Sequence, residues 1–269
     1  MEIRPAHGRT IVPRVLSERD LTPRKPPEVS AAGPDSTPLL IIGAGGFARE
    51  TAAAVHSINA VSPRWDLLGF LDDDPALLGR EFEGAEVLGP VDAGVAAHPD
   101  ASVVVCTGNP QNYFSRPAIV RRLRLAPDRY ATVIHPAASM APTASIGHGT
   151  VILAGAVATA QCRIGNHVVV MPMVAIIHDD LIGDFATLAS GVRLGGGARV
   201  ELGAYLGAGA IVRERVTVGA WSLVAMGAVV TRSVPRAQVW AGVPARCRRA
   251  VDLPAEIADL PPYVDDREA

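Results

Sequence analysis

The sequence predicts two structural units: an α/β domain followed by a solenoid of short parallel strands. The solenoid is indicated by an apolar residue at every sixth position from Ile134 to Val230. A period of six fits neither a helix nor an alternating strand, and is typical of strands that coil around a narrow prism. The α/β domain is indicated by a buried strand, a glycine-rich turn and a helix, beginning near Leu39. An aromatic content of 4% beside 49% hydrophobic residues agrees with thin, stacked coils.

We expect four segments along the chain. Residues 1–37 are rich in Pro, Arg and Glu, show no periodicity and are expected to form a disordered or loosely packed arm. The α/β domain spans 38–130, the solenoid 131–233, and a C-terminal extension 234–269. The α/β domain is about half of a doubly wound fold, too short for the two halves that normally hold a dinucleotide.

The α/β domain is expected to alternate strands with helices. The segments LLII, WDLLGFLDDD, AEVLG and SVVVCTG read as strands, and RETAAAVHSI and FSRPAIVRRLRL read as helices. The arginines of the second helix, Arg121, Arg122 and Arg124, are expected to face solvent. The segment YATVIHP leads as a last strand into the solenoid, whose roughly 100 residues make between five and six coils. After Val230 the chain is expected to leave the repeat and to end in a tail with one helical turn.

The turn after the first strand is a candidate binding site. Gly43, Gly45 and Ala48 match the G-x-G-x-x-G/A pattern, which presents backbone N–H groups at the start of a helix. The second strand ends in acids, and Asp72 is placed to hydrogen-bond a ribose or a base. The alternative is that the glycines only form a tight turn and that residues 72–74 form a solvated loop.

His178 is the candidate catalytic residue of the solenoid. It follows inward-facing Ile176 by two residues, so its side chain is expected to point outward. Residues 18 apart stack on successive coils, which places His178 between Ala160 and Gly196, in a column without large side chains. Asp179 or Asp180 is expected to hold the imidazole tautomer and raise its basicity. The alternative is an ordinary surface histidine.

The other histidines lack such a setting. His135 lies at the domain junction and is expected to be structural. His148 and His167 lie on turns beside glycine or asparagine and are expected to be solvated. His56 and His98 have no neighbouring acid in the sequence.

Composition excludes several classes of function. The formal net charge of −2 gives no electrostatic footprint for nucleic acid or an anionic membrane. No apolar run is long enough to span a membrane and no signal peptide begins the chain, so we expect a cytoplasmic protein. Cys106, Cys162 and Cys247 show neither metal-binding spacing nor a disulfide pattern. We therefore expect a small-molecule partner and no metal.

The repeat resembles the left-handed parallel β-helix of hexapeptide-repeat acyltransferases. Over roughly residues 38–249, the segments GAGGFARE, GFLDDDP, IHPAA, IGHGTVILAGA, IIHDDLIGDFATLASGVRLGGG and AGVPAR resemble the sialic acid O-acetyltransferase and nucleotide-sugar N-acetyltransferase family. The resemblance implies a half-Rossmann-like α/β domain that binds the acceptor, followed by a left-handed parallel β-helix. It also implies a homotrimer with sites between adjacent β-helices, acetyl-CoA or another acyl-CoA as donor, and a sugar, nucleotide sugar or sugar-like acceptor.

Site residues follow from the resemblance position by position. His178 corresponds to the general base of direct transfer to an amine or hydroxyl, and Asp179 to the acid that raises its basicity. The positions expected to contact the CoA thioester are Thr187, Gly196, Ala208, Met226 and Arg246. The positions expected to contact the acceptor are Gly45, Gly46, Phe47, Asp72, Asp73 and Met171.

Four positions in the matching segments depart from the pattern of the family. Phe47 replaces a common histidine, Met171 an asparagine, and Ile177 a glutamate, while Thr187 stands where a second histidine is frequent. All four changes lie near the acceptor or the thioester and make the site more apolar. A less polar acceptor or another acyl donor is therefore plausible.

Two other functions remain open on the sequence. The first is a non-catalytic trimeric scaffold of the same fold, suggested by Met171 and Thr187. The second is a nucleotide-dependent oxidoreductase or epimerase that uses the glycine-rich turn. The short α/β domain argues against the second function.

Overall fold

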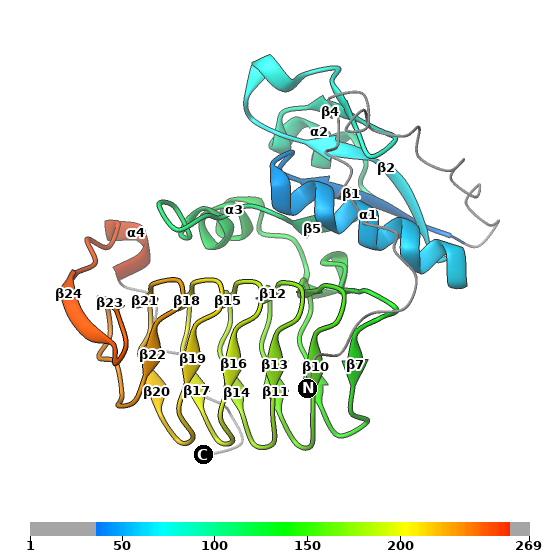
Figure 1. The fold of residues 1–269 in the computed structure, drawn as a ribbon. Helices are drawn as coiled ribbons and strands as arrows, with labels where there is room; N and C mark the ends of the chain where they lie inside the picture. Colours follow the sequence, from blue (N-terminus) through cyan, green and yellow to red (C-terminus); the bar gives the residue numbers. More distant parts are fainter. Residues whose placement is uncertain (1–35, 259–269) are drawn as a thin grey trace, which may run out of the picture.

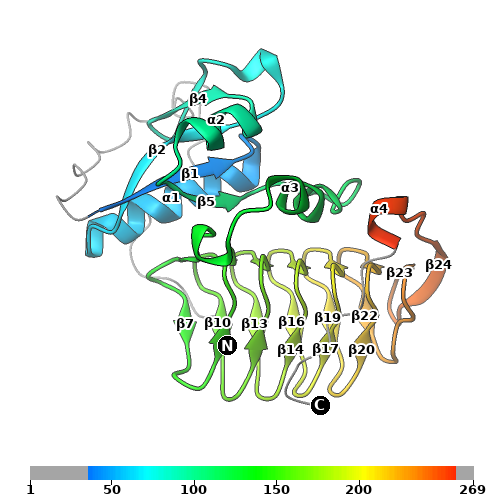
Figure 2. The ribbon, with the colours of Figure 1, turned by 180° about the vertical axis from the view of Figure 1, so that it is seen from behind.

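A computed structural model describes residues 36–258. The arm expected over residues 1–37 and the end of the C-terminal tail lie almost wholly outside these residues. Figures 1 and 2 show an α/β domain lying along one side of a long β-helix. The predicted fold class is therefore confirmed.

The α/β domain contains one five-stranded sheet in the order β3-β4-β2-β1-β5. All pairs in it are parallel except β3 with β4. Its strands are β1 (Thr37–Ile42), β2 (Trp65–Leu71), β3 (Glu81–Phe82), β4 (Ala85–Gly89) and β5 (Ser102–Val105). Its helices are α1 (Gly46–Val61), α2 (Val91–Ala97) and α3 (Ser115–Leu123), with short 3-10 turns η2 (Pro75–Leu77) and η3 (Pro127–Arg129). The sequence reading missed α2, which has only seven residues.

The strand order creates a switch point beside β1. The chain passes from β1 to β2 on one side and later returns to β5 on the other side. Ligands of open α/β sheets bind at the carboxyl ends of strands at such a point. The backbones are close there, because a Cβ on Gly43 would lie 2.8 Å from the carbonyl oxygen of Cys106, and Gly43 has a φ of +98°. Only glycine meets both conditions without strain.

The β-helix has three flat sides, each a ladder of short parallel strands. Side 1 consists of β6 (Val133–Ile134), β9 (Val151–Ile152), β12 (Val169–Val170), β15 (Thr187–Leu188), β18 (Tyr205–Leu206) and β21 (Leu223–Val224). Side 2 consists of β7 (Ser139–Met140), β10 (Val157–Ala158), β13 (Ala175–Ile176), β16 (Arg193–Leu194), β19 (Ile211–Val212) and β22 (Val229–Val230). Side 3 consists of β8 (Ser145–Ile146), β11 (Arg163–Ile164), β14 (Leu181–Ile182), β17 (Arg199–Val200) and β20 (Thr217–Val218).

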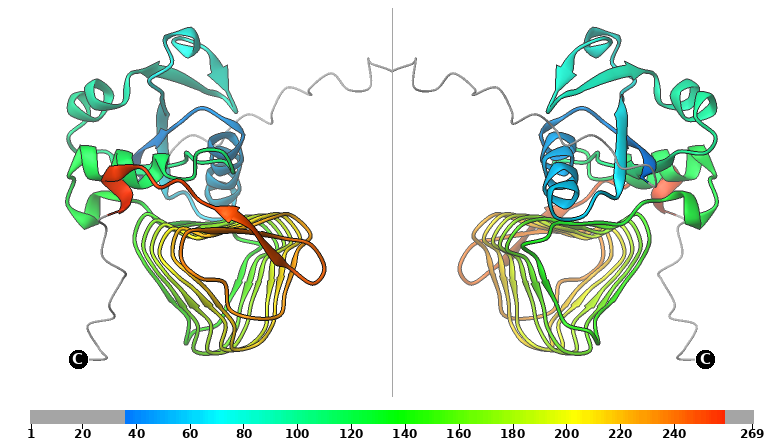
Figure 3. Two further views of the ribbon diagram at one scale, coloured as in Figure 1. Left: turned by 90° about the vertical axis from the view of Figure 1, so that its left-hand side faces the viewer. Right: turned by 90° about the vertical axis from the view of Figure 1, so that its right-hand side faces the viewer.

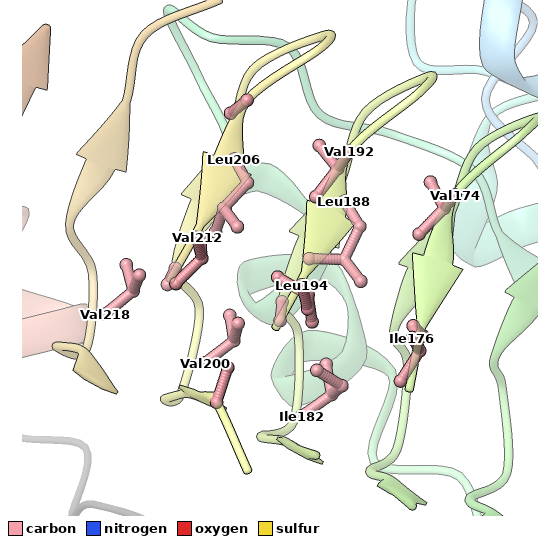
Figure 4. Close-up of a cluster of buried hydrophobic side chains, with 14 of the residues drawn as sticks. Val174, Ile176, Ile182, Leu188, Val192, Leu194, Val200, Leu206, Val212 and Val218 are labelled. Atoms are coloured by element: carbon pink, nitrogen blue, oxygen red, sulfur yellow. The ribbon is translucent and has the colours of Figure 1, made fainter. Parts of the chain in front are cut away.

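The six-residue period sets both the core and the corners. Strands pair with partners 18 residues away, as in Ala158 with Ile176. Figure 4 shows inward side chains from the three sides, such as Ile176, Ile182 and Leu188, filling the prism. Corners also repeat, since their second residue has a left-handed backbone, with φ of 63° at Asp179. The predicted repeat and its unbroken register are confirmed over β6–β22.

Side 1 carries the α/β domain, as the end-on views in Figure 3 show. Val151 and Leu153 of the β-helix belong to the same buried cluster as Ala48 and Val55 of α1. The corner between sides 2 and 3 therefore points away from the α/β domain of its own chain, because a corner of a triangular prism lies opposite the third side.

The end of the repeat differs from the expectation. The chain does not leave the ladder after Val230, because β23 (Gln238–Ala241) pairs in parallel with β21 on side 1. Leu223 then pairs with Val239, a spacing of 16 rather than 18, so a pattern of fixed period could not reveal it. Strand β24 (Arg246–Ala250) adds an antiparallel edge, and α4 (Ala255–Ala258) follows it.

Candidate functional site

The corner between β13 and β14 carries His178 and Asp179. The imidazole Nδ1 lies 2.9 Å from Asp179 Oδ2, and the two side chains are 65% and 61% exposed. An Nδ1–H that donates to this carboxylate leaves the Nε2 lone pair free to accept a proton. The pair therefore has the geometry of an exposed base and its orienting acid.

The corner of the following coil passes directly beneath the imidazole. A Cβ on Gly196 would lie 2.5 Å from both Cε1 and Nε2 of His178. The stacking expected from the 18-residue spacing is thus observed, and the ring rests on the bare Cα of glycine. No side chain larger than hydrogen fits there without moving the ring.

Asp180 does not share the role of Asp179. Its carboxylate is fully buried and accepts hydrogen bonds from the backbone N–H groups of Ile177 and Ala198, both at 2.8 Å. Burial raises the pKa of this carboxyl to about 6, although its hydrogen bonds favour the ionised form. Of the two candidate partners of His178, only Asp179 is within hydrogen-bond distance.

The glycine-rich turn lies at the carboxyl end of β1, at the switch point of the sheet. Gly45 and Gly46 are exposed, and a Cβ on either would meet no atom within 4 Å. Gly45 is the N-cap of α1, so the free N–H groups of the first helical turn point into this open space. This arrangement can accept an anionic or polar part of a ligand.

The acids after β2 are engaged within the domain. Asp72 accepts hydrogen bonds from the N–H groups of Ala44 and Asp74, at 2.9 and 3.0 Å, and so holds the glycine-rich turn. Asp73 accepts from the N–H of Val91 and forms an ion pair with Arg122 at 2.9 Å. The hydrogen bond from Val91 is the main reason that the pKa of Asp73 is lowered, although burial opposes this shift. Both acids thus have partners within the domain.

Phe47 and Met171 line the junction between the two domains. Both are half-buried and pack against the apolar cluster that joins α1 to side 1. Two positions at which the resemblance predicts polar side chains thus contribute apolar surface to this cluster. Ile177 lies elsewhere, on the corner with His178.

Thr187 is not close to His178 within one chain. It lies on side 1, it is buried, and its hydroxyl accepts a hydrogen bond of 2.9 Å from Arg116. The sequence reading missed Arg116, a buried guanidinium on α3 that also donates to the carbonyls of Thr107, His167 and Phe185. Burial lowers the pKa of Arg116 to about 10. No residue pattern predicts this role, because all of its acceptors except the Thr187 hydroxyl are backbone carbonyls.

Ala208 and Met226 lie on the corner between sides 1 and 2, a different corner from that of His178. Both are exposed, and the glycines that follow them have no atom within 4 Å of an added Cβ. Arg246 lies at the start of β24, at the far end of the prism. One chain therefore brings together His178, Asp179 and Gly196, but not these positions or the acceptor-site candidates.

His167 corrects an expectation. It was expected to be solvated, but it is 3% exposed and stacks on Phe185 with ring centroids 5.0 Å apart. Burial, followed by repulsion from His148 and Arg116, lowers the pKa of His167 to about 3. The reason is tertiary: His167 occupies the corner against which the α/β domain packs, and Tyr130 covers its ring.

Two further properties concern residues 36–258. None of the helices there combines the length and the apolar character needed to cross a bilayer. No group of three or more His, Cys, Asp or Glu side chains in that part of the chain is arranged to hold a metal ion.

Comparison with known proteins gives matches to both units. The family described as the PglD N-terminal domain matches residues 38–122. Among curated proteins, the acyl-[acyl-carrier-protein]–UDP-N-acetylglucosamine O-acyltransferases of Pseudomonas paraeruginosa and Pseudomonas aeruginosa are 32% identical over 89 residues. That match covers 33% of this chain and 34% of the relative, so the chain spans about a third of the length of these relatives.

Solved structures match most of the chain. The acetyltransferase domain of PglB from Neisseria gonorrhoeae is 26% identical and has a TM-score of 0.67, or 0.68 in its complex with acetyl coenzyme A. The match covers 79% of this chain and all of that domain. A histidine-to-alanine variant of GDP-perosamine N-acetyltransferase from Caulobacter crescentus, in complex with CoA and GDP-perosamine, is 27% identical with a TM-score of 0.69. That match covers 82% of this chain and all of the other.

Proposed function

Because these findings support the hexapeptide-repeat sugar acetyltransferase family for this chain, we propose that the protein is a CoA-dependent acyltransferase acting on an amine or hydroxyl of a sugar-like molecule. The single observation that carries the proposal is the His178–Asp179 pair resting on Gly196. The structural relatives contain acetyl-CoA, CoA or a nucleotide sugar, which supports the choice of donor and acceptor.

In direct transfer of the acyl group from CoA to the acceptor, His178 accepts one proton and later returns it. Nε2 takes the proton from the attacking amine or hydroxyl, while Asp179 stabilises the imidazolium through Nδ1–H. An acyl-CoA supplies the thioester carbonyl that is attacked and the thiolate that leaves. The imidazolium then returns its proton to the leaving sulfur, so His178 ends the cycle neutral.

We place the complete site between subunits of a homotrimer. The His178 corner points away from the α/β domain of its own chain, whereas Ala208 and Met226 lie on another corner. Ala208, Gly209 and Gly227 leave space on that second corner, as a thin pantetheine arm requires. Gly45, Gly46, Asp72 and the apolar pair Phe47 and Met171 then offer an acceptor pocket suited to a sugar with a less polar face.

The acyltransferase proposal is tested with purified protein, acetyl-CoA and a panel of nucleotide-linked amino and hydroxy sugars, with free CoA thiol as the readout. An acyl-carrier-protein donor is the comparison arm. We expect His178→Ala to lower the rate at least a hundredfold. Equal rates for the native and variant proteins would exclude His178 as the base.

The subunit arrangement is tested by complementation. His178→Ala and Met226→Arg are each expected to be inactive as pure trimers, since each spoils a different part of every site. Unfolding and refolding the two together would form mixed trimers in which some sites draw both parts from undamaged copies. Regained activity supports a shared site, and mixtures as inactive as the separate variants would place the whole site within one chain.

A further inference from the structure

Asp180 is a costly residue at its position. It points into the prism where the equivalent positions of neighbouring coils hold Cys162 and Ala198. It is the one buried carboxylate among residues 36–255, and no ion pair involving it is present in that part of the chain. Burying a carboxylate without a cation opposes folding. A residue that the repeat does not need for packing therefore calls for another explanation.

The hydrogen bonds of Asp180 are made to backbone groups next to His178 and close to Gly196. One carboxylate oxygen accepts from the N–H of Ile177, the residue before His178, at 2.8 Å. The other accepts from the N–H of Ala198, two residues beyond Gly196, at 2.8 Å. The carboxylate thus ties the corner that carries His178 to the corner on which the imidazole rests.

The charges around Asp180 come from the same region. The charge of His178 favours the ionised form of Asp180, and the charge of Asp179 opposes it. The charge of Asp180 in turn helps to raise the pKa of the Cys162 thiol on the preceding coil, although burial is the larger cause. The carboxylate therefore contributes negative charge behind the imidazole as well as two backbone anchors.

We infer that Asp180 is a positioning residue, which holds the His178 imidazole against Gly196 by anchoring the backbone on both sides of that contact. The inference rests on the proposed function, in which His178 is the base. Asp180 touches no reacting atom in this scheme and acts through the geometry of the two corners.

The test is Asp180→Ala in the full-length protein, because alanine is the residue that the repeat itself uses at position 198. We expect kcat to fall at least tenfold, the KM for acetyl-CoA to stay within twofold and the melting temperature at pH 8 to be equal or higher. Cys162→Ala, one coil earlier in the same column, is the matched control and should keep kcat within twofold. A purely structural role predicts the reverse: a lower melting temperature and an unchanged kcat.

A second measurement does not depend on activity. Hydrogen–deuterium exchange should accelerate in peptides covering Ile177 and Ala198 of Asp180→Ala, and not in those of Cys162→Ala. If the native protein transfers no acyl group, the proposed function fails while faster exchange still supports the anchoring role. Unchanged exchange, or a kcat within twofold of native, would overturn the inference.

Discussion

Gly196→Ala tests whether the contact beneath His178 is functional. The φ of Gly196 lies outside the left-handed region, so alanine introduces no backbone strain there. The new Cβ would lie 2.5 Å from Cε1 and Nε2 of His178, whereas unstrained carbon contacts begin at about 3.5 Å. The imidazole must therefore move by about 1 Å, and a displacement of that size can lower a rate about a hundredfold, or roughly 2.7 kcal/mol of barrier.

The assay is steady-state release of CoA thiol, with melting temperature measured in parallel. We expect kcat of Gly196→Ala to fall about a hundredfold while the fold stays intact. In the His178→Ala background the same substitution should have almost no further effect, because the two residues act as one unit. Gly79→Ala is the control: at a φ of +73°, with the Glu86 side chain at an ordinary contact distance of 3.7 Å from the new Cβ, it should lower stability and leave kcat unchanged. A Gly196→Ala variant within threefold of native would refute the reasoning.

Four further results are expected. Asp179→Asn should keep the fold, since asparagine tolerates the φ of 63° at this position, and lower kcat about tenfold in the same assay. Arg116→Met should lower the free energy of unfolding in urea by about 3 kcal/mol, because it leaves the buried acceptors His167 O, Phe185 O and Thr187 Oγ1 unpaired. The pKa of His167 is about 3 against an ordinary 6.5, so the histidine is neutral in the folded protein. Its contribution to the free energy of unfolding is fully present above pH 6.5 and is lost, by up to about 5 kcal/mol, as the pH drops toward 3. In urea titrations, His167→Asn should reduce this dependence on pH. The pKa of Asp180 is shifted in the opposite direction, to about 6 against an ordinary 3.8. Its contribution to the free energy of unfolding is therefore fully present below pH 4 and falls by about 3 kcal/mol as the pH rises through 6. Asp180→Ala should remove this loss.

The β-helix could be predicted from the sequence because its rule is local and repeated. Every inward position from Ile134 to Val230 follows the same period, and strand pairing at 18 residues is a direct consequence. The contact of His178 with Gly196 required nothing more than that spacing. The glycine-rich turn was readable for a similar reason, since the strand, turn and helix are contiguous.

The rest depends on contacts between distant segments. His167 has the sequence setting of an exposed turn, but the rings of Tyr130, His148 and Phe185 pack around it and it is buried. Arg116 serves backbone carbonyls of the β-helix, which have no signature in side-chain sequence. Asp180 occupies an inward position of the repeat but carries a charged group where neighbouring coils have Cys162 and Ala198. Its two N–H partners could be identified only from the structure.

The regular corners also place equivalent residues at a fixed spacing along the axis of the prism. Pro172, Ser190, Ala208 and Met226 occupy one corner in successive coils, the first of them in the coil of His178. Neighbouring strands are about 4.8 Å apart, so Met226 lies roughly 14 Å along the axis from the level of His178. If the proposed thioester arm follows this corner, the length it must span is a whole number of coils. An inserted coil of 18 residues would lengthen that reach by one rung while leaving each local contact unchanged.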